Sequence, residues 1–285
     1  MDNKILIFGG TGYLGTYLVK ACIKLGHQTF VYARPITPQS SPHKIDLHHE
    51  FRSLGVTVIE GELDEHEKIV ATLRQVDIVI SSLPFPQVPD QIHIIEAIKV
   101  AGNIKRFIPL EFGVEEDRLS FLPPFEACLD KKLKIRRAVE ACGIPYTYIS
   151  ANCFVLFNYK EDIAEYTIKL ANDPRTCNRI VFYRTPENVL SQIELVSLWE
   201  KKTGRSFRKT LVQEEELLKL TENLAFPDNV RASLHSIFVK GDLNYDLGED
   251  DLETWSLNPD YKYTTMDQPL DIFLIDPPKP AIAAF

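Results

Sequence analysis

The sequence predicts an α/β protein built on a Rossmann fold, a doubly wound parallel sheet with helices on both faces. The first observation is a short apolar run, residues 5–8, that leads directly into a glycine-rich turn and then a helix. The second is an alternation of strands and helices to about residue 152, which is typical of parallel strands joined by right-handed crossovers. Ligands of such sheets bind beyond the carboxyl ends of the strands, so we expect the functional residues there.

Each helix and strand predicted in this first part is supported by its own short stretch of sequence. The run ILIF is apolar and β-prone, as a central strand requires, and Gly26 is a suitable end for the helix that follows it. QTFVYA, residues 28–33, is rich in β-branched and aromatic residues and predicts the second strand. The same reasoning gives strands at 56–60, 77–81, 106–109 and 145–150, and helices at 65–73, 91–101 and 129–142.

After Phe154 the pattern becomes mixed and predicts a smaller, interleaved α/β substrate lobe. Expected helices cover residues 162–171, 191–202, 213–223 and 229–239, and a short strand at 180–183 is a candidate to return to the main sheet. We therefore predict a cofactor-binding Rossmann domain over residues 1–157 and a discontinuous substrate lobe over 158–285. Its proline-rich end, DPPKPAIAAF, is expected to be extended.

The glycine turn has the spacing of a dinucleotide pyrophosphate site. Gly10, Gly12 and Gly15 satisfy G-x-G-x-x-G, and Gly9, Gly12 and Gly15 satisfy a looser G-x-x-G-x-x-G. Such glycines allow a tight turn, close approach of the phosphates and close packing of the helix. An ordinary strand-to-helix turn is the alternative, but strand, turn and helix occur here in the required order.

The end of the second expected strand indicates which dinucleotide is bound. Arg34 stands where an NAD site usually has an acidic residue for the ribose 2′-hydroxyl, and a guanidinium suits a 2′-phosphate instead. Arg34 therefore predicts NADP(H). Lys44 lies in the polar stretch that follows and is either a second cation for the same phosphate or a solvated loop lysine.

Composition excludes several other classes of protein. The chain has 285 residues, 45% of them hydrophobic, and a formal net charge of -8, which gives no general attraction to nucleic acid or to an anionic membrane. It shows neither a signal peptide at its N-terminus nor a membrane-spanning run. The five cysteines are odd in number and lack metal-binding spacing. We expect reduced thiols, no metal and a cytoplasmic location.

A nicotinamide reductase needs a side chain that manages a proton, and the Tyr-x-x-x-Lys pair of short-chain dehydrogenases is absent here. The helix expected at 129–142 carries Lys131, Lys132 and Lys134 instead. Successive helical residues point about 100° apart, so these three cannot share one face, and at most one or two can point to a cofactor. The alternative is a solvated basic face.

Several segments together resemble one family. They are GGTGYLG, GELDEHEKIVATLRQVDIVIS, EAIKVAGNIKRFIPLEFGVEEDR, LPPFEA, IPYTYISANCF and LWEKKTG, together with Arg34. The chain is identified by them as a member of the isoflavone reductase-like group of plant NADPH-dependent reductases, which are NmrA-type, atypical short-chain dehydrogenases. GELDEHEK and the tail PPKPAIAAF are most similar to eugenol and isoeugenol synthases.

The resemblance implies a reaction and a catalytic residue. The expected substrate is a small phenolic compound, a phenylpropenyl ester such as coniferyl acetate, which loses acetate to give a quinone methide that accepts hydride from NADPH. Lys132 is implied as the general base that removes the phenolic proton, or as the group that holds the phenolate. As a base it requires a lowered pKa through burial or through Lys131, Arg136 and Arg137 nearby.

The resemblance also implies a set of cofactor residues. They are, for the pyrophosphate, Gly9, Thr11, Gly12, Tyr13, Leu14 and Gly15; along the nucleotide, Ser82, Phe85 and Gln87; near the nicotinamide, Asn152, Cys153 and Phe154. Phe85 and Phe154 are equally well interpreted as core aromatics, and Cys153 as a small buried filler. Leu110 replaces the serine that the group usually has before Glu111.

The chain departs from the group just after Phe154. Only Val155, Leu156 and Phe157 stand where relatives have a longer stretch before a segment like NYKEDIAEY, and the chain is about two dozen residues short there. Loss of a stretch that contributes to the substrate pocket predicts intact NADPH binding with weakened or altered substrate turnover. Other open interpretations are a phenylcoumaran benzylic ether, pinoresinol-lariciresinol or isoflavone reductase, or a catalytically weakened NADPH-binding protein. The protein is expected to be a monomer or a homodimer.

Overall fold

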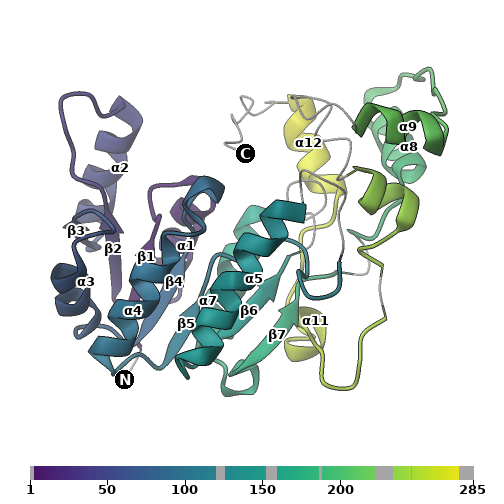
Figure 1. Cartoon of the computed structure of the whole chain (residues 1–285). Helices are drawn as coiled ribbons and strands as arrows, with labels where there is room; N and C mark the ends of the chain where they lie inside the picture. The colour runs from purple at the N-terminus through teal and green to yellow at the C-terminus, as the bar shows by residue number, and fades with distance from the viewer. Residues whose placement is uncertain are drawn as a thin grey trace.

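The computed structural model describes residues 3–119, 126–151, 159–185, 188–221, 234–244 and 246–275. It contains two parallel sheets. The first has five strands in the order β3-β2-β1-β4-β5, and the second has three in the order β6-β7-β8 (Figure 1). The predicted parallel Rossmann-type sheet is thereby confirmed.

The five-stranded sheet is made by the first part of the chain. Its strands are β1 (Ile5–Phe8), β2 (Thr29–Ala33), β3 (Thr57–Glu60), β4 (Ile78–Ser81) and β5 (Arg106–Ile108). The central strand β1 pairs with β2 on one side and β4 on the other, and all four of its residues are buried. A central strand covered on both faces explains why the sequence shows a continuous apolar run there.

Alternate residues of the strands build two separate cores. Ile5 and Ile7 face one layer of helices, and Leu6 and Phe8 face the other. The first layer consists of α1 (Tyr13–Lys24), α2 (Pro42–Ser53) and α7 (Lys160–Asn172). The second consists of α3 (His66–Leu73), α4 (Gln91–Ala101) and α5 (Glu126–Ala141).

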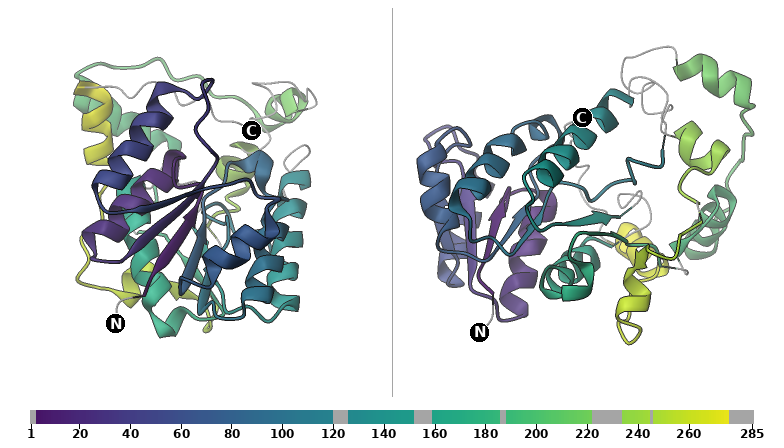
Figure 2. Two further views of the ribbon diagram at one scale, coloured as in Figure 1. Left: turned by 90° about the vertical axis from the view of Figure 1, so that its left-hand side faces the viewer. Right: turned by 60° about the horizontal axis from the view of Figure 1, so that its bottom comes forward.

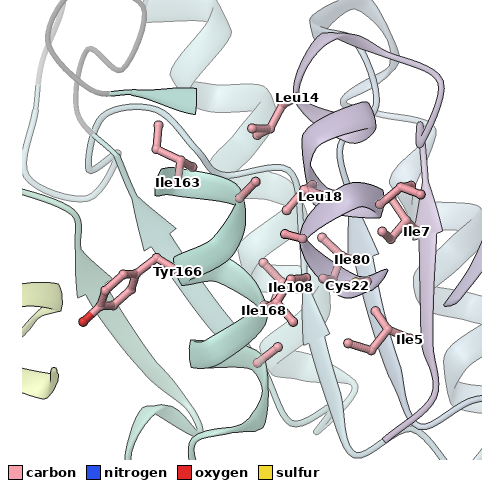
Figure 3. Close-up of a cluster of buried hydrophobic side chains, with 14 of the residues drawn as sticks. Ile5, Ile7, Leu14, Leu18, Cys22, Ile80, Ile108, Ile163, Tyr166 and Ile168 are labelled. Atoms are coloured by element: carbon pink, nitrogen blue, oxygen red, sulfur yellow. The ribbon is translucent and has the colours of Figure 1, made fainter. Parts of the chain in front are cut away.

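Helix α7 belongs to the second half of the sequence but packs along α1. Leu14 and Leu18 of α1 and Ile163 and Ile168 of α7 share one core cluster, and Figure 3 shows these side chains gathered between the two helices. Tyr166 of α7 points away from them in the same view. The second half of the chain is thus attached to the five-stranded sheet and its helices through a continuous apolar core.

The second sheet continues from the edge of the first. Its strands are β6 (Thr147–Ser150), β7 (Arg179–Phe182) and β8 (Leu252–Glu253). A parallel bridge between Phe107 and Tyr146 links β5 to the start of β6. The strand expected at 180–183 pairs with β6 rather than within the five-stranded sheet. The domain boundary near residue 157 stays a prediction.

The remaining helices come from the second half of the chain, and the right-hand view of Figure 2 shows α8 and α9 at the end of the molecule far from β1 to β3. They are a 3₁₀-helix at Pro174–Thr176, α8 (Gln192–Thr203), α9 (Glu214–Thr221), a π-helix at His235–Lys240, α11 (Thr254–Leu257) and α12 (Asp267–Ile275). The expected helix at 229–239 is described only from residue 234, and the tail 276–285 lies outside the described residues. None of the helices in the described part has the length and apolarity that crossing a membrane requires.

Candidate active site

The glycine turn between β1 and α1 has no room for side chains. A Cβ atom on Gly10 would lie 2.9 Å from Val31 Cγ1, and one on Gly15 would overlap the carbonyl oxygen of Gly9. The N–H of Gly12 donates to that carbonyl oxygen at 2.9 Å and closes the turn. The three glycines therefore bring the backbone of β1, α1 and the turn into direct contact, the arrangement that a closely approaching pyrophosphate requires.

The turn presents the N-terminus of α1 to the outside. Gly12 is the N-cap residue and supplies no side-chain cap, the first turn carries no acidic residue, and Gly12 and Tyr13 are exposed. Uncapped N–H groups at a helix N-terminus attract anions. Thr11 is half-buried beside them, whereas the side chain of Leu14 lies in the core, so that only its backbone can serve a cofactor.

Ser82 joins the turn to the next strand. It follows β4, and its hydroxyl donates to the carbonyl oxygens of Phe8 at 3.1 Å and Gly9 at 3.3 Å. Phe85 and Gln87 form a short 3₁₀-helix just after it. Phe85 packs partly buried against the core, which agrees with the interpretation as a core aromatic.

Arg34 is exposed at the carboxyl end of β2. Lys44 lies in the first turn of α2, not in a loop, and is half-buried. The nearest strand-end carboxylate of β3, Glu60, accepts a hydrogen bond from Arg52 at 2.6 Å. This edge of the sheet therefore presents an exposed guanidinium, that of Arg34, at the position that distinguishes NADP(H) from NAD(H) in such sites.

Among the three lysines of α5, only Lys132 is turned inward. Lys131 and Lys134 are exposed, whereas the Lys132 side chain is 12% exposed. Its Nζ donates to the carbonyl oxygen of Glu111 at 2.6 Å and to Glu116 Oε1 at 2.8 Å. A Cβ atom on Gly113 would lie 2.9 Å from this Nζ, so a methyl group added there would displace the end of the lysine side chain.

One turn further along α5, Arg136 is completely buried among carboxylates. Its Nη2 donates to Glu111 Oε2 at 2.5 Å and to Glu116 Oε2 at 2.6 Å, and its Nη1 donates to Glu115 Oε1 at 2.6 Å. The guanidinium also lies over the ring of Tyr148 at 4.7 Å. We call Glu111, Glu115, Glu116, Lys132 and Arg136 the buried charge cluster.

The two carboxyl groups nearest Lys132 lie in different electrostatic surroundings. Burial, and next the charge of Glu116, raise the pKa of Glu111 to about 8, although Arg136 acts in the opposite direction. Burial also opposes ionisation of Glu116, but the charges of Lys132 and Arg136 and a hydrogen bond from Glu111 outweigh it and lower the pKa of Glu116. The surroundings therefore shift the pKa values of these two carboxyl groups apart, upward for Glu111 and downward for Glu116.

The sequence interpretation missed Glu115 and Glu116. It expected Arg136 and Arg137 to act on Lys132 as like charges, but Arg136 is enclosed by carboxylates and Arg137 pairs with Asp117 and Glu140. The available signal was the acidic run EED at 115–117 together with arginines four and five residues after Lys132. Asn152, Cys153 and Phe154 lie outside the described residues.

The fold and the site define a Rossmann-type protein with a tight glycine turn that leads into an uncapped helix N-terminus, and with a buried, ion-paired lysine. The family model for the NmrA-like family matches residues 1–160 and 154–270. The chain belongs to this NmrA-like family, and the resemblance inferred from its sequence segments is confirmed.

The most similar known proteins include an enzyme of phenylpropene formation. Isoeugenol synthase 1 of Clarkia breweri is 51% identical over 316 residues, which covers 99% of this chain and 99% of that protein. The crystal structure of an isoflavone reductase is 37% identical, has a TM-score of 0.90 and is matched over 96% of this chain and all of the other. AtPrR2 with NADP⁺ and (+)-pinoresinol is 33% identical with a TM-score of 0.88, over 96% and 99% of the two chains.

The comparison also bears on the short stretch after Phe154. The match to the Clarkia enzyme extends over 316 positions, at least 31 more than the 285 residues of this chain. The family model matches in two pieces that meet at residues 154–160. Both findings agree with a shortened segment at that point.

Proposed function

We propose that the protein is an NADPH-dependent reductase that converts a phenylpropenyl ester of the coniferyl acetate type into isoeugenol or eugenol. The observation that carries the proposal is a single inward-facing lysine, Lys132, on the helix that follows the strand-end residue Glu111. The 51% identity to an isoeugenol synthase over nearly the whole of both chains supports this substrate class.

The residues of the turn fit a bound NADPH. Gly9, Gly12 and the N-terminus of α1 would hold its pyrophosphate, and Arg34, with Lys44 as a second cation, would hold its 2′-phosphate. Asn152, Cys153 and Phe154 are proposed to lie near its nicotinamide. When bound, this group supplies the hydride.

Lys132 would handle the phenolic oxygen of the substrate. A phenolate para to the propenyl side chain pushes its electron pair through the ring and expels acetate, which leaves an electrophilic quinone methide for the hydride. Lys132 serves this sequence either as the general base that takes the phenolic proton or as the cation that holds the phenolate. Both roles require Nζ at the phenolic oxygen.

The test is product analysis by mass spectrometry after incubation with NADPH and a panel of phenylpropenyl esters. We expect a phenylpropene from coniferyl acetate, and Lys132→Met should lower turnover by about 10²–10⁴-fold while NADPH still binds. The exposed neighbour gives the control, Lys131→Met, which should keep normal turnover.

The panel should also contain pinoresinol and a benzylic ether, because one related structure holds (+)-pinoresinol. Reduction of these compounds in place of the esters would assign the protein to the lignan or benzylic ether reductases. NADPH binding without turnover of any of them would leave a nucleotide-binding protein and contradict the proposed activity.

A further inference from the structure

The amino group of Lys132 makes two hydrogen bonds to the protein, and these decide what it can offer a substrate. Of the three N–H bonds of a lysine ammonium, one points to the carbonyl oxygen of Glu111 and a second to Glu116 Oε1. One N–H bond is left for a substrate oxygen. An uncharged amine has only two N–H bonds, so when both contacts are made it has only its lone pair for the substrate. The ammonium would therefore donate a hydrogen bond to the phenolic oxygen, whereas the amine would accept the phenolic proton.

The carboxylate of Glu116 is itself held in place. Its side chain is fully buried, its Oε2 accepts from Arg136 Nη2 at 2.6 Å, and its Oε1 accepts from Lys132. A carboxylate bridging two cations in a dry environment has little freedom to rotate. Glu116, together with the carbonyl oxygen of Glu111, therefore holds the Nζ atom of Lys132 in place.

The composition of the cluster favours the charged form of Lys132. The buried carboxyl groups of Glu111, Glu115 and Glu116 surround Arg136, and Lys132 is the second cation beside them. Removing the proton from Lys132 would take one of two cations from a buried site that holds more carboxyl groups than cations, which is unfavourable.

Two further groups face this cluster from neighbouring segments of the described chain. Asp117 is partly exposed and is paired with Arg136 and with Arg137, and the ring of Tyr148 on β6 lies under the guanidinium of Arg136. Burial raises the pKa of Tyr148 well above its usual range, so its hydroxyl stays neutral. Neither group adds a positive charge beside Lys132.

We propose that Glu116 is a positioning residue that holds Lys132 as an ammonium, and that Lys132 stabilises the substrate phenolate instead of acting as the base. The inference rests on the proposed function. In this step the phenolic O–H bond breaks and its proton passes to solvent water. The electron pair of the phenolate then expels acetate with the C–O bonding pair, and hydride adds to the side chain.

The first experiment compares Glu116→Gln with Glu115→Gln in pH profiles of kcat/KM on coniferyl acetate. Both variants remove one buried carboxylate from Arg136, but only Glu116 touches Lys132. Loss of the Glu116 charge makes the ammonium easier to deprotonate, so the alkaline loss of activity should move to lower pH by about one unit or more. In Glu115→Gln the alkaline loss of activity should stay at the wild-type pH, whatever the absolute rate of this variant.

The opposite role gives the opposite result. If Lys132 were the base, the same shift would increase the amount of amine, and Glu116→Gln would gain activity near neutral pH. A gain of this kind, or identical profiles for Glu116→Gln and Glu115→Gln, overturns the proposal.

Substitution of the lysine gives a second arm that leaves the buried carboxylates in place. Arginine is charged at every usable pH, so Lys132→Arg should keep much more activity than Lys132→Met. Equal inactivity of the two variants, both able to bind NADPH, also overturns the proposal.

A third measurement does not depend on turnover. Acetic anhydride labels free amines, and mass spectrometry of the Lys132 peptide gives its labelling rate against pH in the protein without substrate. Labelling should begin at lower pH in Glu116→Gln than in the wild type and Glu115→Gln; equal labelling contradicts the proposal. If the wild type binds NADPH but turns over no ester, the proposed function fails, while this measurement still decides the role of Glu116.

Discussion

Gly9 and Ser82 are so close that only a glycine fits between the first strand and the fourth. A Cβ atom on Gly9 would lie 2.5 Å from the carbonyl oxygen of Ser82, and Gly9 has a φ angle of +75°, which favours glycine. The hydroxyl of Ser82 donates back to the carbonyl oxygen of Gly9. This contact holds the glycine turn, where a pyrophosphate would bind, against the end of β4.

We therefore expect Gly9→Ala to abolish tight NADPH binding. The variant combines left-handed strain of about 1–3 kcal/mol with a clash against backbone that cannot move without displacing β4. Gly26→Ala is the matched control, because Gly26 has a φ angle of +81° and no heavy atom lies within 4 Å of the place that an added methyl group would take. Fluorescence titration with NADPH checks this: the control should lose stability but keep its affinity, and unchanged affinity in Gly9→Ala would refute the assignment of the turn.

Arg34 should decide the preference between NADPH and NADH. Hydrogen bonds to a charged group contribute about 1.5–3 kcal/mol, so Arg34→Ser should weaken NADPH binding by about 10- to 100-fold and leave NADH binding nearly unchanged. Arg52→Ser removes a neighbouring guanidinium that is already paired with Glu60 and serves as the control. Equal losses for both cofactors would mean that Arg34 does not contact the 2′-phosphate.

Glu111 should make the stability of the protein fall with rising pH. Its pKa is about 8 in the folded protein, above the ordinary value of 4.5, so the folded state holds a proton that the unfolded state releases. Stability from this group is full below pH 4.5 and is lost as the pH rises toward 8.

The variant Glu111→Gln imitates the protonated carboxyl and removes this dependence. Its free energy of unfolding relative to the wild type should increase by about 1.4 kcal/mol per pH unit between pH 5 and 8 and then level off. Denaturant titrations at several pH values measure the difference. Parallel curves for the two proteins would show that Glu111 is ionised throughout.

The parts of the molecule that could be predicted are those that short runs of consecutive residues determine. The strand, turn and helix around Gly9 to Gly15 follow from consecutive residues, and the helix expected at 129–142 is observed as α5 at Glu126–Ala141. Helical geometry also predicted that the lysines of α5 cannot all face inward, and only Lys132 does.

The buried charge cluster was not predictable in the same way. Glu116 and Arg136 are 20 residues apart and meet because α5 packs beside the segment after β5. Charged residues in a polar stretch usually indicate a solvated surface, so the run EED indicated partners for the arginines of α5 but not their burial. Only the tertiary structure distinguishes these carboxylates from surface ones.

The shortened stretch after Phe154 should make the reaction inefficient without affecting cofactor affinity. The match to the Clarkia enzyme extends over at least 31 more positions than this chain has residues. We expect about two dozen of the missing positions to lie after Phe154, in a stretch that contributes to the substrate pocket. A less enclosed pocket admits water, and water competes with hydride for a quinone methide. We therefore expect more acetate to be released than NADPH oxidised, with coniferyl alcohol formed from the difference.

Three quantities measured in one reaction check this: acetate released, NADPH oxidised and phenylpropene formed. Lys132→Met, assayed in parallel, gives the spontaneous loss of acetate to be subtracted. Insertion after Phe154 of the corresponding stretch from the Clarkia isoeugenol synthase should bring acetate and NADPH toward equal amounts while leaving the NADPH dissociation constant unchanged. A ratio of one in the chain as it stands would mean that the hydride reaches the side chain before water does, and that the shorter segment still closes the site.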